Sequence, residues 1–148
     1  MGTYVNPGNQ AFKRISGPNY VDKTGMIRLI NERIGGDDSL VCVSRPRRFG
    51  KSYAAKMLCA YYDCSCDSQE LFEKKKIAGT KAYGVHLNQY NVVYLDITGF
   101  ISAAQRQGIF LREIPNIIVE AIRDELFLLD PELPPEKSLT DCLIRHVE

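Results

Sequence analysis

The spacing of apolar residues predicts several amphipathic helices. Apolar side chains recur every three or four positions across residues 26–34, where Asp22 or Thr24 offers an N-cap and a glycine pair ends the pattern. Helical spacing also extends across residues 54–64 and 109–126, and Pro115 should begin a new helix within the second stretch or kink it. We expect a short helix at residues 68–72, and a capping box at residues 138–141 should begin another.

Two apolar runs, at residues 40–43 and 91–97, have the near-continuous hydrophobicity of buried parallel strands. Strands separated by helices predict an α/β protein, with a parallel sheet between helical layers in a three-layer α/β/α fold. Such a sheet usually has about five or six strands, so two strands indicate a domain that is cut short. The exposed strand edges of such a fragment should favour self-association.

The string Arg-Pro-Arg-Arg-Phe-Gly-Lys-Ser at residues 45–52 follows the first apolar run and precedes a predicted helix. This is the layout of a P-loop, in which backbone N–H groups and the N-terminus of the next helix face phosphate oxygens. Lys51 would reach the β- and γ-phosphates and act in catalysis, and Ser52 would place its hydroxyl on Mg²⁺. The string therefore predicts binding of ATP and Mg²⁺.

One position departs from the usual Gly-x-x-x-x-Gly-Lys-Ser/Thr pattern, because Arg45 stands where the first glycine is expected. The first turn of the loop must then form without a residue that tolerates positive φ. A tight strand-to-helix turn with an exposed lysine is the alternative interpretation. The guanidinium groups of Arg45, Arg47 and Arg48 suit either phosphate oxygens or the carboxylates of a partner domain.

Three segments resemble the bacterial AAA-ATPase-like family, in which a P-loop ATPase module is often followed by a PD-(D/E)xK nuclease-like domain. They are Tyr-Val-Asp-Lys-Thr at residues 20–24, the loop at residues 44–52, and Val-Tyr-Leu-Asp at residues 93–96. Together they span about residues 12–100. The loop string is specific to this group, so the resemblance makes the missing first glycine a trait of the family.

The resemblance implies that residues 1–148 are the N-terminal part of a single P-loop domain. Residues 1–38 would form an N-terminal helical segment, and residues 39–148 would form an incomplete nucleotide-binding core. In relatives the Walker B strand and its catalytic glutamate follow a helix that resembles the one expected at Ser138, so the chain should end before them. Its partners would be the missing C-terminal domains, possibly nuclease-like, and the fragment alone would be weakly active or inactive.

The candidate site residues fall into three groups. The predicted phosphate-binding residues are Arg47, Arg48, Phe49, Gly50, Lys51, Ser52 and Tyr53. Tyr20 and Val21 are candidate contacts to the base or ribose, because the resemblance places their segment on the adenine side; Asp22 is more simply a helix N-cap.

Asp96 is a candidate Mg²⁺ ligand beside Ser52, because it ends the second predicted strand 45 positions after Lys51. Against this role, Ile97 follows it instead of a glutamate that would orient water, and the family places its Walker B strand later. The alternative is an aspartate that caps a turn toward Thr98 and Gly99.

Composition and charge limit the classes of binding partner that we expect. The chain of 148 residues has 19 basic and 18 acidic side chains, and this balance favours neither nucleic acid nor a membrane. The clear basic clusters are the three arginines of the loop and the lysines at 74–76, and no aromatic stacking pattern for bases lies between these clusters. No apolar run approaches a membrane span and the first residues lack a secretory signal, so we expect a cytoplasmic protein.

The sequence as a whole predicts ATP binding through a Walker A loop, with Mg²⁺-dependent hydrolysis in the full-length protein. One alternative is a non-hydrolysing, nucleotide-responsive interaction module whose arginine-rich loop docks a partner. Another is a small-molecule kinase that uses Asp96.

Overall fold

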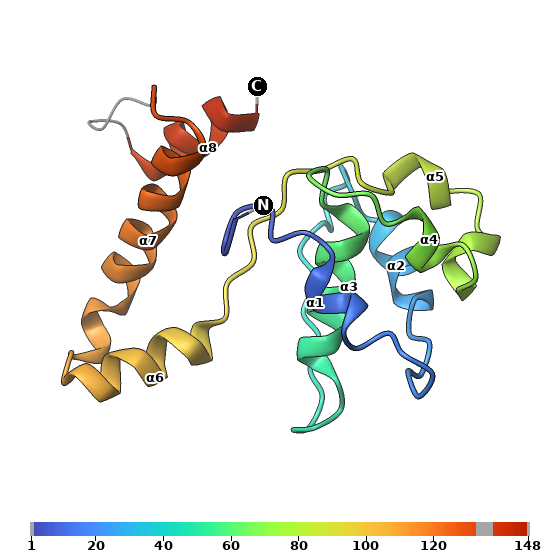
Figure 1. Ribbon diagram of the computed structural model, residues 1–148, viewed down its shortest axis with the longest axis horizontal. Coiled ribbons are helices and arrows are strands. Elements are labelled where there is room, and N and C mark those ends of the chain that lie inside the picture. Colours follow the sequence, from blue (N-terminus) through green and yellow to red (C-terminus); the bar gives the residue numbers. More distant parts are fainter. Residues whose placement is uncertain (1, 133–137, 148) are drawn as a thin grey trace. The chain divides into compact units, whose positions relative to one another are not determined.

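The computed structural model describes residues 2–132 and 138–147, and most of its regular structure is helical (Figure 1). In chain order the elements are α1 (Gln10–Lys13), α2 (Gly25–Asn31), α3 (Lys51–Tyr62), α4 (Gln69–Phe72), the 3₁₀ turn η1 (Lys76–Gly79), α5 (Tyr83–His86), α6 (Ile97–Gln107), the 3₁₀ turn η2 (Leu111–Glu113), α7 (Ile114–Leu129) and α8 (Leu139–Val147). None of the helices in these described ranges is long and apolar enough to cross a membrane. The chain divides into two compact units, one of Asn6–Val92 and one of Gly2–Val5 with the chain from Val93 onward.

The predicted three-layer α/β/α fold is wrong, because the described residues contain no β-sheet. Their β-pairing consists of two isolated bridges, an antiparallel one between Val5 and Val93 and a parallel one between Asp63 and Tyr90. A strand persists only where its backbone N–H and C=O groups find a neighbouring strand. The apolar run at residues 40–43 has no such neighbour in the described chain, and its Leu40 side chain is 96% exposed.

The second apolar run, at residues 91–97, also forms no continuous strand. Within one unit, the carbonyl of Val92 accepts a hydrogen bond from the N–H of Asn6 at 2.8 Å. Within the other, the N–H of Tyr94 donates to the carbonyl of Tyr4, also at 2.8 Å. The run ends in α6, which begins at Ile97, and this helix is not predicted by the sequence pattern.

The Asn6–Val92 unit is held by an aromatic and aliphatic core. Phe12 of α1 stacks on Phe72 of α4 with ring centroids 5.3 Å apart, and its edge meets the ring of Tyr20 at 5.4 Å. The buried core residues are Phe12, Ile27, Met57, Ala60, Tyr61, Phe72 and Ile77. Because α3 contributes three of them, its C-terminal half is fixed in the core while its N-terminus reaches the surface.

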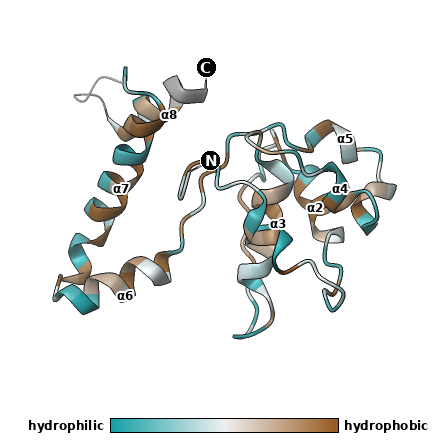
Figure 2. Cartoon of the chain, in the orientation of Figure 1, coloured by the Kyte–Doolittle hydropathy of each residue, from teal (hydrophilic) through white to brown (hydrophobic). Residues whose placement is uncertain are grey.

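The second unit packs along α7, where hydrophobic and hydrophilic residues alternate around the helix (Figure 2). Ile122 and Leu126 of α7 are buried with Val5 and Cys142. The carboxylate of Glu125 accepts hydrogen bonds from the N–H groups of Tyr4, at 2.8 Å, and Val5, at 3.4 Å. The segment Gly2–Val5 is thereby attached to α7 by both apolar and polar contacts.

The helices that the apolar spacing predicts are largely confirmed. Pro115 lies in the first turn of α7, directly after η2, so that it begins a new helix. At the start of α8, the N–H of Asp141 donates to Ser138 Oγ at 3.2 Å, and Ser138 Oγ donates to Asp141 Oδ2 at 2.7 Å. The first bond is one half of the predicted capping box, and the second joins the two side chains in place of the return bond to the backbone N–H of Ser138.

Candidate phosphate-binding site

The loop at residues 45–50 runs directly into α3, and its turns do not fall where the usual glycine pattern places them. Left-handed backbone occurs at Arg48, with φ of 67°, and at Gly50, with φ of 78°. Arg45 does not have positive φ. An arginine in place of the first glycine is therefore tolerated, while the arginine at position 48 carries a strain of about 1–2 kcal/mol.

The N-terminus of α3 is left open to an anion. Gly50 is the N-cap residue and provides no side-chain acceptor, and no acidic residue lies in the first turn. The first hydrogen bond of the helix runs from the N–H of Ala54 to the carbonyl of Gly50 at 2.9 Å. The N–H groups of Gly50, Lys51, Ser52 and Tyr53 precede it, so these donors and the positive end of the helix dipole face outward without a helical partner.

Lys51 folds back over the loop. Its Nζ donates to the carbonyl of Arg45 at 2.5 Å and to the carbonyl of Pro46 at 3.0 Å. Lys51 is exposed, which also fits the alternative interpretation of a tight turn with an exposed lysine. Its ammonium group is, however, hydrogen-bonded to the loop. The positive charge is thus held over the loop by bonds that an anionic ligand can replace.

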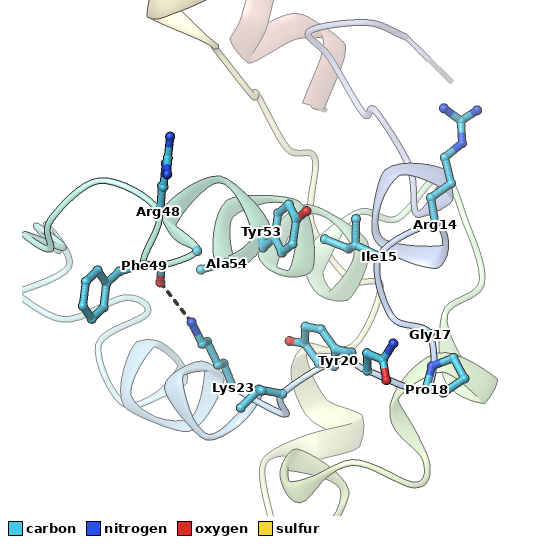
Figure 3. A pocket seen from close by; sticks show the side chains of 13 residues that line it. Arg14, Ile15, Gly17, Pro18, Tyr20, Lys23, Arg48, Phe49, Tyr53 and Ala54 are labelled. Atoms are coloured by element: carbon cyan, nitrogen blue, oxygen red, sulfur yellow. Dashed lines mark hydrogen bonds between the residues drawn. The ribbon is translucent and has the colours of Figure 1, made fainter.

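A pocket of about 620 Å³ lies beside the loop (Figure 3). Its lining residues are Arg14, Ile15, Gly17, Pro18, Asn19, Tyr20, Val21, Lys23, Arg48, Phe49, Gly50, Tyr53 and Ala54. The pocket therefore brings the two predicted base-side residues together with four of the predicted phosphate-binding residues. Arg47, Lys51 and Ser52 do not line it, and they lie on the loop and on the first turn of α3 next to it.

Tyr20 and Val21 face this pocket in different ways. Burial raises the pKa of the Tyr20 hydroxyl, which donates to Met57 Sδ at 3.3 Å. Lys75 Nζ lies 5.1 Å from the centre of the Tyr20 ring. Tyr20 therefore lines the pocket and is held by contacts to the core, whereas Val21 is 72% exposed and accessible to a ligand.

Asp22 anchors the base-side segment and does not act as a helix N-cap, because Thr24 occupies the N-cap position of α2. Its carboxylate accepts hydrogen bonds from Thr24 N at 2.9 Å, Thr24 Oγ1 at 2.7 Å and Lys76 N at 2.8 Å. The buried Thr24 Oγ1 in turn accepts from the N–H of Ile77 at 3.2 Å. These bonds attach the segment at residues 20–24 to η1.

Replacing Asp22 with asparagine should make the stability of the protein less dependent on acid pH. Burial raises the pKa of Asp22, but hydrogen bonds from Thr24 and Lys76 and the charge of Lys75 outweigh it and place this pKa below its ordinary value of 3.8. The carboxylate therefore stabilises the fold above that ordinary value and loses this effect as the pH falls through the lower folded-state pKa. Thermal unfolding at pH 7 and pH 3 should show a Tm deficit of a few degrees for Asp22→Asn at pH 7 that shrinks at pH 3. Asp37→Asn, on an exposed turn, is the control, and an equal deficit at both values would contradict the prediction.

The candidate metal ligands Ser52 and Asp96 belong to different compact units of the chain. Asp96 Oδ1 accepts a hydrogen bond from the N–H of Gly99 at 3.2 Å and so caps α6. This agrees with the alternative interpretation, in which Asp96 is a capping residue. In the described part of the chain no three His, Cys, Asp or Glu side chains form a cluster that would hold a metal ion. A Mg²⁺ ion at the loop would need phosphate oxygens and water as ligands beside the Ser52 hydroxyl, so it would bind together with a nucleotide. A Mg²⁺ role for Asp96 stays a prediction.

Sequence reasoning assigned no role to Lys23, although it lies within the string at residues 20–24 that carries the family resemblance. Its Nζ donates to the carbonyl of Phe49 at 3.0 Å. The sequence signal that could have identified Lys23 is its place in the segment that carries the family resemblance.

The sequence model of the family described as Predicted AAA-ATPase matches residues 7–132. The chain belongs to this family. The matched range includes the base-side segment, the loop and Asp96, so it confirms the resemblance drawn from those residues. Membership of the Predicted AAA-ATPase family is consistent with an ATP-related function. Comparisons with curated proteins and with solved structures gave no match.

Proposed function

We propose that the chain binds Mg·ATP, with the phosphates on the loop and the first turn of α3 and the base beside Tyr20 and Val21. The observation that carries this proposal is the pocket of about 620 Å³, which joins the loop to the base-side segment. Pockets for small-molecule ligands and cofactors generally have volumes of about 300–1,000 Å³. The open N-terminus of α3 at one side of this pocket supplies the donors that phosphate oxygens require.

Each loop residue has a defined part in this binding. The Lys51 ammonium would exchange the carbonyls of Arg45 and Pro46 for phosphate oxygens, and the N–H groups at the start of α3 would donate to the same anion. The Ser52 hydroxyl would hold Mg²⁺, which offsets the negative charge of the phosphates. The exposed guanidinium groups of Arg47 and Arg48 would add bidentate contacts.

Hydrolysis of the bound ATP belongs to the same proposal. Loss of the terminal phosphate requires an acidic residue or an equivalent group that orients the attacking water. The family resemblance assigns this role to a glutamate of a Walker B strand.

A second candidate function is a non-hydrolysing interaction module. Arg45, Arg47 and Arg48 are all exposed, and the side chain of the adjacent Phe49 is 61% exposed. An exposed aromatic residue among guanidinium groups also suits a protein surface that carries carboxylates. A nucleotide-independent form of this module needs no nucleotide, so nucleotide titration separates that form from the proposed ATP binding.

The test is a calorimetric titration of the chain with Mg·ATP, Mg·ADP and adenosine. We expect saturable binding of both nucleotides, and binding of adenosine that is weaker by at least about tenfold because it lacks the phosphate contacts. Equal binding of all three ligands would overturn phosphate recognition by the loop. No binding of any of them would overturn the proposal and favour the interaction module.

A further inference from the structure

Lys23 connects the two sides of the pocket through a single hydrogen bond. Its side chain extends from the base-side segment toward the loop, where Nζ donates to the carbonyl of Phe49 at 3.0 Å (Figure 3). A Cβ atom on the next residue, Gly50, would lie 2.9 Å from this same nitrogen. Glycine at position 50 therefore does more than permit a φ of 78°, because it also leaves room for the lysine to reach the backbone.

This hydrogen bond fixes the orientation of one peptide group. In a trans peptide the C=O and the following N–H point in opposite directions, and the described residues contain no cis peptide. With the Phe49 carbonyl held on Lys23, the N–H of Gly50 is turned away from Lys23. Gly50 is the N-cap of α3, so its N–H is the first of the four donors at the helix start that lack a helical partner.

We propose that Lys23 is a positioning residue for phosphate binding: it holds the Phe49–Gly50 peptide so that the Gly50 N–H joins the other donors at the start of α3. The inference rests on the proposed function and extends it to a residue outside the loop. Asp22 and Thr24, on either side of Lys23, are themselves bonded to η1, so the lysine extends from a fixed segment. The loop is thereby aligned before an anion arrives, which reduces the entropy lost on binding.

The test compares Lys23→Met with Lys81→Met in the full chain. Methionine keeps most of the aliphatic stem and removes the donor, and Lys81 is an exposed lysine of the same unit that does not line the pocket. We expect Lys23→Met to weaken Mg·ADP binding by about five- to tenfold, the size of one ordinary hydrogen bond, because the Gly50 N–H remains present and only its alignment is lost. Lys81→Met should bind as the unchanged chain does, and Lys23→Arg, which keeps a cationic donor, should recover most of the affinity. The Tm of all variants should stay within a few degrees, because Lys23 is exposed.

A second readout needs no nucleotide. The amide resonance of Gly50 in a ¹⁵N–¹H spectrum should shift in Lys23→Met and not in Lys81→Met, because only Lys23 bonds to the preceding carbonyl. An unchanged Gly50 resonance would overturn the positioning role, whatever the nucleotide affinity. A shifted resonance with unchanged Mg·ADP affinity would overturn the role in phosphate binding alone. If the unchanged chain bound no Mg·ADP, the proposed function and the role of Lys23 in phosphate binding would both fail. The Gly50 resonance would still decide whether Lys23 orients the Phe49–Gly50 peptide.

Discussion

Replacing Lys51 with alanine should weaken Mg·ATP binding on the order of 100-fold, because hydrogen bonds to charged groups each contribute about 1.5–3 kcal/mol. The ammonium group already bonds to the Arg45 and Pro46 carbonyls, so binding exchanges two neutral acceptors for charged phosphate oxygens. Alanine removes the charge, and the two carbonyls that it leaves belong to exposed residues that water can reach. The Tm of Lys51→Ala should therefore change little, while its affinity for Mg·ATP falls strongly. Calorimetric titration and thermal unfolding of the same preparation measure both.

The control for this prediction is Lys56→Ala, which removes a lysine from the same helix at a position that does not line the pocket. Lys51→Met serves as a second variant, since it keeps the aliphatic stem over the loop and removes only the charge and the donors. Both Lys51 variants should lose binding to a similar extent. Affinity within about twofold of the unchanged chain in Lys51→Ala would show that phosphates do not meet the loop, since even one lost hydrogen bond exceeds that change.

Helices were predictable from the sequence because their signals are local. The Ser138 cap on the N–H of Asp141 and the proline in the first turn of α7 depend on residues within one turn of each other. The apolar spacing before the glycine pair at 35–36 placed α2 in the same way. Helices α1, α5 and α6 were missed. The first two have only four residues each and are too short to show an apolar repeat. The first residues of α6 continue an apolar run that reads as a strand until Asp96 caps the helix.

Strands were not predictable in the same way, because a strand needs a partner that sequence alone does not supply. The run at residues 40–43 has the apolar character of a buried strand, yet Leu40 is almost fully exposed in the structure. The run at residues 91–97 meets the chain start in single hydrogen bonds and one isolated bridge. Apolar character indicates a tendency to be buried, and the available neighbours decide whether a sheet forms.

The candidate site was predictable as a set of residues and not as a geometry. Spacing identified Gly50, Lys51 and Ser52, and the structure places all three at an uncapped helix N-terminus. The contact between Lys23 and the Phe49 carbonyl joins positions 26 residues apart, and no local pattern specifies it. The left-handed backbone at Arg48 is equally hidden, since sequence rules assign that conformation to glycine.

Loss of the Asp63 carboxylate should strongly destabilise the unit that carries the site. Its side chain is fully buried at the C-terminus of α3. Oδ2 accepts from the N–H of Gly8 at 2.5 Å, and Oδ1 accepts from the N–H of Ser65 at 2.8 Å. Asp63→Ala leaves both donors without their acceptor, at a cost of about 3 kcal/mol. The Tm should fall by more than about 10 °C for a unit of this size.

The matched control is Asp67→Ala, because Asp67 is exposed and its carboxylate accepts from the N–H of Gln69 at 2.9 Å. That variant should lose at most about 1 kcal/mol, as for an exposed helix cap. Asp63→Asn keeps one acceptor oxygen and should fall between the two alanine variants. Equal Tm losses for the two alanine variants would contradict the role given to Asp63. Asp63 lies at the C-terminus of α3, whereas the phosphate loop lies at its N-terminus. Mg·ATP affinity measured well below the Tm should therefore be unchanged in Asp63→Ala. This result would separate the stability of the helix from phosphate binding at its N-terminus.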